Sequence, residues 1–105
     1  MADFKAVTIH EEGGRPAAAV HAIPDWDGFE KLLRFVQKHY GATVVEQVDG
    51  PDARKAVVEV EGHRIEVLHE DDVGNTLVSA EAGADETLRT LAADLGKRLA
   101  GLAPS

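Results

Sequence analysis

The stretch from residue 54 to residue 82 constrains the fold more than any other part of the chain. It reads RKAVVEVEGHRIEVLHEDDVGNTLVSAEA, in which two runs of alternating apolar and polar residues meet at Glu61-Gly62 and a third run follows an acidic segment. Alternation of this kind is typical of strands with one buried and one solvated face, and glycine beside a polar residue is typical of the tight turn between antiparallel strands. The stretch therefore predicts an antiparallel meander.

The first hairpin of this meander has one register that buries its apolar side chains. With a two-residue turn, Val58 lies opposite Ile65 and Glu59 lies opposite Arg64, so one face is apolar and the other pairs opposite charges. A slip by one residue would set Val58 against Arg64, which the burial pattern opposes. In the register expected for the third strand, Glu81 also lies beside Arg64.

The third strand is expected over residues 76–80, with Val67 facing Val78. This register makes Leu68 and Leu77 neighbours on the outer face of the sheet, where they would form a small apolar area. Together with a sheet edge, such an area is a candidate contact for a homodimer.

An N-terminal hairpin is expected from residues 4–10 and 17–23, which flank the turn composition of residues 11–16. Three adjacent registers fit its pattern, because the alanines of the second strand do not alternate with larger side chains. The sequence therefore leaves open whether His21 faces the core or the solvent.

The segment after Pro24 has the periodicity of an amphipathic helix that ends at Gly41. Either Asp27 caps this helix together with Glu30, or Asp25 caps it and leaves Asp27 in the first turn. Its apolar stripe, with Trp26 on the same side, consists of Phe29, Leu32, Leu33, Val36 and Tyr40.

A second helix is expected over residues 83–102, with Asp94 and Arg98 placed for an ion pair one turn apart. Gly96 inside this helix costs about 1 kcal/mol relative to alanine, so we expect either a close approach to a strand or a locally weak helix. Its apolar stripe, which we expect to lie on the sheet, consists of Ala84, Leu88, Leu91, Ala92, Leu95, Leu99 and Leu102.

With a further strand over residues 42–48, these elements predict an α+β fold of order ββ-α-ββββ-α. The simplest arrangement is a two-layer sandwich, in which both helices lie on one face of a mainly antiparallel sheet. A chain of 105 residues fits one domain, and residues 103–105 are expected to be a frayed end.

Charge and composition exclude several classes of partner. The chain has 19 acidic and 11 basic residues and a formal net charge of −8, which repels nucleic-acid phosphates. It has no cysteine, so neither disulfides nor thiolate metal sites are available. Without a signal-peptide pattern or a long apolar run, we expect a cytoplasmic protein with no nucleic-acid partner and no membrane contact.

Histidines and carboxylates remain as candidate metal ligands. The candidate cation site is the turn formed by His69, Glu70, Asp71 and Asp72, provided that the turn brings these side chains together. His63 cannot share an ion with His69, because about 20 Å of strand separates them.

The sequence contains no recognisable catalytic motif. Ser79 lies in a predicted strand and Ser105 at the terminus, and neither has the GxSxG context of a nucleophile. No glycine-rich loop precedes a helix, so no phosphate site and no cofactor are expected. We assign no catalytic residue, although residues distant in sequence can still assemble a site.

Two functions from different classes remain open. The missing catalytic signature favours a non-catalytic protein-interaction or assembly module, which would act through a sheet edge or the surface around Phe35 on a protein partner or a second copy of the chain. The alternative is a protein, enzymatic or not, that binds a small ligand or divalent cation in a pocket between the first helix and the sheet. The residues assigned to these surfaces are Trp26, Phe35, His39, Tyr40, His21, Leu68 and Leu77.

Overall fold

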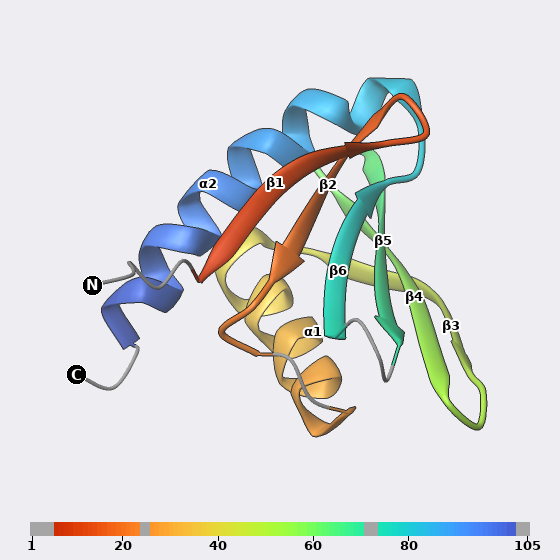
Figure 1. The fold of residues 1–105 in the computed structure, drawn as a ribbon. Helices are drawn as coiled ribbons and strands as arrows, with labels where there is room; N and C mark the ends of the chain where they lie inside the picture. Colours follow the sequence, from red (N-terminus) through yellow and green to blue (C-terminus); the bar gives the residue numbers. More distant parts are fainter. Residues whose placement is uncertain (1–5, 24–25, 71–73, 103–105) are drawn as a thin grey trace.

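The computed structural model of the protein describes residues 6–23, 26–70 and 74–102 (Figure 1). The described part of the chain contains a six-stranded antiparallel sheet and two α-helices, with a short 3-10 turn, Ala82–Ala84, before the second helix. The elements are β1 Val7–Glu12, β2 Arg15–Val20, α1 Trp26–Tyr40, β3 Thr43–Asp49, β4 Ala53–Val60, β5 His63–Glu70, β6 Gly74–Ser79 and α2 Asp85–Leu102.

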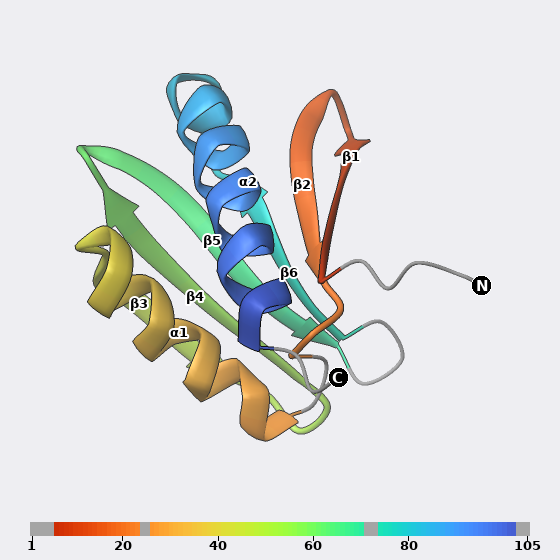
Figure 2. The same ribbon diagram turned by 90° about the vertical axis from the view of Figure 1, so that its left-hand side faces the viewer.

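The structure confirms the predicted two-layer α+β fold. The strands follow the order β1-β2-β6-β5-β4-β3 across the sheet. Both helices lie on the same face: α2 packs over β1, β2 and β6, and α1 packs over the side formed by β5 and β3 (Figures 1 and 2). The described residues place no helix on the other face.

The apolar stripes of both helices meet the sheet, as the periodicity predicted. Each fully buried leucine or phenylalanine contributes about 1.5–3 kcal/mol relative to its exposed state, so this layer of contacts dominates the stability. The buried side chains at the centre of the core include Phe29, Leu32, Leu33 and Val36 of α1, Leu88, Leu91, Leu95 and Leu99 of α2, and Val58, Ile65, Val67 and Leu77 of the sheet.

The hairpin of β4 and β5 has the predicted register. Val58 pairs with Ile65, and Glu59 pairs with Arg64. The turn residues Glu61 and Gly62 both have positive φ, 52° and 81°. This is the sign required by the two-residue turns that match the twist of the flanking strands.

The expected register between β5 and β6 is wrong by one residue. Val67 pairs with Leu77 and Leu68 pairs with Thr76, so the two leucines are not neighbours. Leu77 is 1% exposed and belongs to the core, whereas Leu68 is half-buried on the face without helices. Leu77 and Val78 are both apolar, so alternation alone could not decide which of them faces the helices.

Glu81 contacts the backbone of Arg64, whereas the sequence predicted that it would lie opposite Arg64 in the strand pairing. Glu81 Oε1 accepts a hydrogen bond from the backbone N–H of Arg64 at 2.9 Å. The one-residue shift of β6 also pairs Ile65 with Ser79 instead of Ala80. Arg64 itself is exposed opposite Glu59, as the hairpin register requires.

The N-terminal hairpin is paired with Val7 opposite Val20, through a turn at Gly13 and Gly14 with φ of 60° and 81°. Both strands lie closer to this turn than the sequence predicted. His21 is exposed, and its Nε2 lies 2.8 Å from Thr8 Oγ1. This register settles the orientation that the alanine-rich strand had left open.

The start of α1 distinguishes between the two predicted caps, and its end confirms the predicted terminating glycine. Because α1 begins at Trp26, Asp27 lies in its first turn and is not the cap. The other predicted cap, Asp25, lies outside the described residues. At the C-terminal end, Gly41 has φ of 66°, the left-handed conformation expected of a helix-terminating glycine.

Gly96 lies where α2 passes over β1. A Cβ atom added at Gly96 would lie 3.6 Å from the Cβ atom of Val7, which is ordinary van der Waals contact. Within the described residues, no helix combines the length and apolar character needed to cross a membrane.

Candidate functional site

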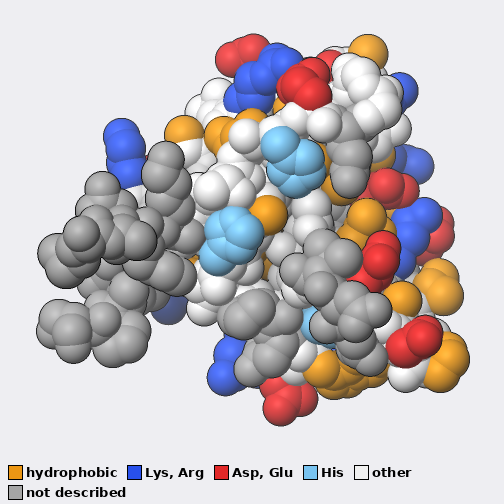
Figure 3. Space-filling model, viewed as in Figure 1, with side chains coloured by type: hydrophobic (Ala, Val, Ile, Leu, Met, Phe, Trp, Pro, Cys, Tyr) orange, Lys and Arg blue, Asp and Glu red, His pale blue; other side chains and the backbone are white. Residues whose placement is uncertain are grey.

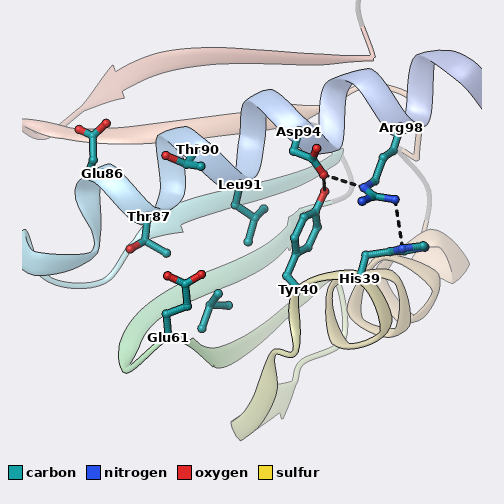
Figure 4. A pocket seen from close by; sticks show the side chains of 10 residues that line it. His39, Tyr40, Glu61, Glu86, Thr87, Thr90, Leu91, Asp94 and Arg98 are labelled. Carbon is teal, nitrogen blue, oxygen red and sulfur yellow. Dashed lines mark hydrogen bonds and ion pairs between the residues drawn. The ribbon is translucent and has the colours of Figure 1, made fainter.

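A cleft of about 500 Å³ lies between the C-terminal end of α1, the β4–β5 turn and α2 (Figure 4). Its size falls within the roughly 300–1,000 Å³ typical of ligand sites. Figure 2 shows that the two helices rest separately on the sheet, and the cleft is found between them. The lining residues are His39, Tyr40, Val60, Glu61, Glu86, Thr87, Thr90, Leu91, Asp94 and Arg98.

A hydrogen-bonded network joins the two helices along one wall of this cleft. The hydroxyl of Tyr40 donates to Asp94 Oδ2 at 2.8 Å, and Arg98 Nε donates to the same oxygen at 2.6 Å. Arg98 Nη1 lies 3.4 Å from His39 Nδ1, and the guanidinium carbon lies 5.9 Å from the centre of the Tyr40 ring. The wall is therefore held by side chains from both helices (Figure 4).

The network sets the protonation states of Tyr40 and Asp94. Hydrogen bonds from Arg98 and from Tyr40 lower the pKa of the Asp94 carboxyl below its usual value. Burial, followed by the contact with Asp94, raises the pKa of Tyr40 above its usual value. At neutral pH the carboxyl is ionised and the phenol is protonated, so neither group is suited to proton transfer near pH 7.

Carboxylates dominate the part of the cleft beyond this network. Asp94 is neutralised by Arg98, whereas Glu61 has no hydrogen bond or ion pair from its side chain to the described residues. Glu86 is 84% exposed and lies 3.5 Å from Arg89, a contact of little energy at that exposure. The floor is apolar because Val60 and Leu91 are buried there. The cleft thus combines an apolar floor with an uncompensated negative charge at Glu61.

A second polar cluster surrounds Arg54 at the N-terminal end of α1. The Arg54 side chain is 8% exposed and bonds Glu30 at 2.5 Å and Asp49 at 3.0 Å. Its guanidinium carbon lies 5.0 Å from the Trp26 ring centre and 4.7 Å from that of Phe29. The hydrogen bond from Arg54 lowers the pKa of Asp49. Since the guanidinium already bonds both carboxylates, this cluster anchors α1 to the β3–β4 hairpin and leaves no free donor aimed at a ligand.

The structure brings together only part of the predicted pocket. His39 and Tyr40 line the cleft, but Trp26 lies at the other end of α1, about 21 Å away at 1.5 Å per residue. His21 lies in the turn after β2, beside Thr8 of β1, and does not line the cleft. The interior between α1 and the sheet is filled by the apolar stripe of the helix.

The remaining predicted surface residues have separate surroundings. Phe35 is partly buried against the core, and its ring lies against that of His39 with centres 4.3 Å apart and planes inclined at 44°. Trp26 contacts His69 edge to face at 5.4 Å. The face seen in Figure 3 shows acidic and basic side chains interspersed with small hydrophobic areas, outside the atoms drawn in grey.

The predicted cation site is only partly described. His69 is buried, and its Nδ1 lies 2.9 Å from Asn75 Oδ1, while Glu70 is exposed. Asp71 and Asp72 lie outside the described residues. Among the residues that the structure describes, no group of three or more His, Asp or Glu side chains is placed to hold a metal ion.

Sequence reasoning missed most of the cleft. It identified Asp94 and Arg98 only as a helical ion pair, and it treated Glu61 only as a turn residue. Nothing in the sequence indicated that Thr87 and Thr90 line a cleft, because threonines are common on helix surfaces. The one available indication was Tyr40 at the end of an apolar stripe, since a partly buried tyrosine hydroxyl usually finds a hydrogen-bond partner.

No protein family, curated protein or solved structure matches this chain. The function is therefore inferred from the geometry of the cleft.

Proposed function

We propose that this protein is a non-catalytic interaction module that holds a short segment of a partner protein in the cleft between α1 and α2. The observation that carries the proposal is the cleft itself, in which polar side chains from both helices and the β4–β5 turn surround an apolar floor. Sites that bind ligands commonly combine a mainly apolar lining with a few convergent polar groups.

The chemistry of the lining residues supports binding over catalysis. The ionisable pair Tyr40 and Asp94 is held in one protonation state by burial and hydrogen bonding. The hydroxyls of Thr87 and Thr90 have no hydrogen bond to a base among the described residues, as an activated nucleophile would require. The one histidine of the lining, His39, lies against the Phe35 ring and 3.4 Å from Arg98, so the cleft chiefly supplies shape and charge.

The β3 edge of the sheet is less suited to this function than the cleft. β3 is an edge strand with a bulge between Val44 and Glu46. Bulges twist an edge away from further strand pairing and are a common protection against it. The net charge of −8 also opposes self-association, so we infer a different protein as the partner in place of a second copy.

Selection of displayed peptides on the immobilised protein tests this function. Thr90 is exposed on α2 and lines the cleft, so Thr90→Trp should fill the cleft with little effect on the core. We expect selected peptides to bind the native protein and to bind the Thr90→Trp variant at least about tenfold more weakly.

The matched control is Thr43→Trp, an exposed threonine on β3 outside the cleft. Selected peptides should bind this variant as they bind the native protein. Enrichment of no peptide, or equal binding to the native protein and the Thr90→Trp variant, would show that the cleft does not hold a protein segment.

The volume of the cleft also favours a second candidate function, the binding of a small molecule. A cleft of about 500 Å³ has room for a metabolite-sized ligand. A thermal-shift panel of small metabolites would identify this function if one compound raises the melting temperature of the native protein and not that of the Thr90→Trp variant.

A further inference from the structure

We infer that the segment held in the cleft presents a lysine or arginine side chain, with its charged head at Glu61. This inference rests on the proposed function and adds the chemistry of the occupant.

Acidic side chains outnumber lysine and arginine side chains along the cleft, and the one arginine is already paired. Its acidic side chains are Glu61, Glu86 and Asp94, and its only lysine or arginine is Arg98. Asp94 and Arg98 cancel each other at 2.6 Å. Glu61 remains without a described partner, and Figure 4 shows its carboxylate reaching from the β4–β5 turn toward Thr87 on α2. A cation bound there would gain a charge-assisted hydrogen bond and meet the nearby threonine hydroxyl.

The backbone at Glu61 supports a role for its side chain beyond the turn. Its φ of 52° is uncommon for a residue with a side chain, and asparagine or glycine is the usual choice at this position of a two-residue hairpin turn. Unfavourable backbone conformations of this kind gather at functional sites. Placing glutamate here lowers local stability and directs a carboxylate to the cleft.

The proposed occupant, a segment of a protein, limits the choice of cation. Val60 and Leu91 line the cleft but are only 3% and 5% exposed, so they offer little surface to an aliphatic stem. Among protein side chains, lysine and arginine are the ones that carry a stable positive charge near neutral pH. Arg98 already lies over the Tyr40 ring, and its repulsion directs a second cation to the Glu61 end of the cleft.

Peptide pools with one fixed central residue and randomised flanks test this inference. The central residue is lysine, arginine, norleucine, glutamine or glutamate, and norleucine resembles the lysine stem without its charge. We expect the native protein to bind the lysine and arginine pools about tenfold more tightly than the norleucine pool, the range of one hydrogen bond to a charged group.

Variants at Glu61 assign this preference to its carboxylate. Glu61→Gln keeps the size of the side chain and removes the charge, so the lysine and norleucine pools should bind it equally. Glu46→Gln removes the same charge from an exposed position on β3 outside the cleft, and this variant should keep the native preference.

The outcomes separate this inference from the proposed function. Equal binding of the lysine and norleucine pools by the native protein, both weakened by Thr90→Trp, would keep the cleft as the binding site and overturn the cationic occupant. A preference that survives Glu61→Gln would also overturn it. No binding by any pool would contradict the proposed function itself.

A third variant excludes damage to the fold as the cause of lost binding. Glu61→Asn places a residue suited to positive φ in the turn, so its denaturation midpoint should rise while its preference for lysine disappears. If lysine preference and stability fell together, Glu61 would be a structural residue of the hairpin and the inference would be wrong.

Discussion

The hydroxyl of Tyr40 donates a hydrogen bond to Asp94 Oδ2 at 2.8 Å, although the two residues lie 54 positions apart in the chain. Tyr40 is the last residue of α1, and Asp94 lies within α2. The bond therefore joins two helices that otherwise rest separately on the sheet, and Arg98 extends the link to His39. Because these side chains form one wall of the cleft, the shape of the candidate site depends on this contact.

Tyr40 should ionise at a higher pH than a free tyrosine, whose pKa is about 10. Burial and then Asp94 raise its pKa, and Tyr40 is the only tyrosine, so tyrosinate absorbance reports it directly. The protonated phenol is favoured in the folded state, so the stability it contributes is present below about pH 10 and lost as the pH rises further. Asp94→Asn should lower the pH at the midpoint of the Tyr40 titration. Identical midpoints for the native and variant proteins would mean that the contact is absent in solution.

The free energy of unfolding should decrease on acidification, because two specific carboxyls become protonated and lose their ion pairs. Hydrogen bonds from Arg54 and from Arg98 lower the pKa values of Asp49 and Asp94 respectively. Their contribution is fully present above the unfolded value of about 3.9 and is lost as the pH falls through the lower folded values. Urea denaturation at a series of pH values checks this expectation. The Asp49→Asn, Asp94→Asn double variant should show a smaller decrease below about pH 4, and an unchanged decrease would contradict the assignment.

Removing the guanidinium of Arg54 should weaken the anchor between α1 and the β3–β4 hairpin. Arg54→Ala leaves Glu30 and Asp49 unpaired, although both can take up water, so we expect a loss of about 1–3 kcal/mol in the free energy of unfolding. Fluorescence of Trp26, the only tryptophan, should change because Arg54 lies over its ring.

The control for this prediction is Lys55→Ala, at the next residue of β4. Lys55 is 43% exposed and pairs with Glu66 at 3.1 Å, so its removal should cost less than about 1 kcal/mol. Equal losses for the two variants, measured by urea denaturation, would show that the Arg54 cluster is not a specific anchor.

Alanine should have opposite effects at two glycines of the helices. Gly96→Ala gains helix propensity and meets Val7 only at ordinary contact distance, so we expect stabilisation by about 0.5–1 kcal/mol. Gly41→Ala should destabilise by roughly 1 kcal/mol, because φ of 66° is unfavourable for a residue with a Cβ even though no atom crowds it. Guanidinium denaturation measures both variants. A destabilised Gly96→Ala protein would mean that α2 lies closer to β1 than described.

Glu61→Asn should stabilise the β4–β5 hairpin. The left-handed conformation costs an ordinary residue about 1 kcal/mol, and asparagine tolerates it better. We expect a gain of up to about 1 kcal/mol in the free energy of unfolding, measured by urea denaturation. A loss of stability would show that the Glu61 carboxylate makes a stabilising contact within the fold.

The alternation of apolar and polar residues predicted the register of some strands correctly and did not decide that of others. Val58 and Ile65 could be paired from the sequence because their strands alternate cleanly and a two-residue turn fixes the offset. β6 contains Leu77 beside Val78, so either could have faced the helices, and the packed structure buries Leu77. The register of alanine-rich β2 could not be predicted for a related reason, since side chains of one size do not show which of them face the core.

The sequence by itself determined the element order, the helix stripes and the hairpin of β4 and β5, because these depend on periodicities within short segments. Only the tertiary structure decided the β6 register, the burial of Arg54 and the cleft at Tyr40 and Asp94. These features depend on which distant side chains meet once both helices lie on one face of the sheet. Contacts across 54 residues leave no local pattern in the chain, because their energy is gained only when packing brings the two partners together.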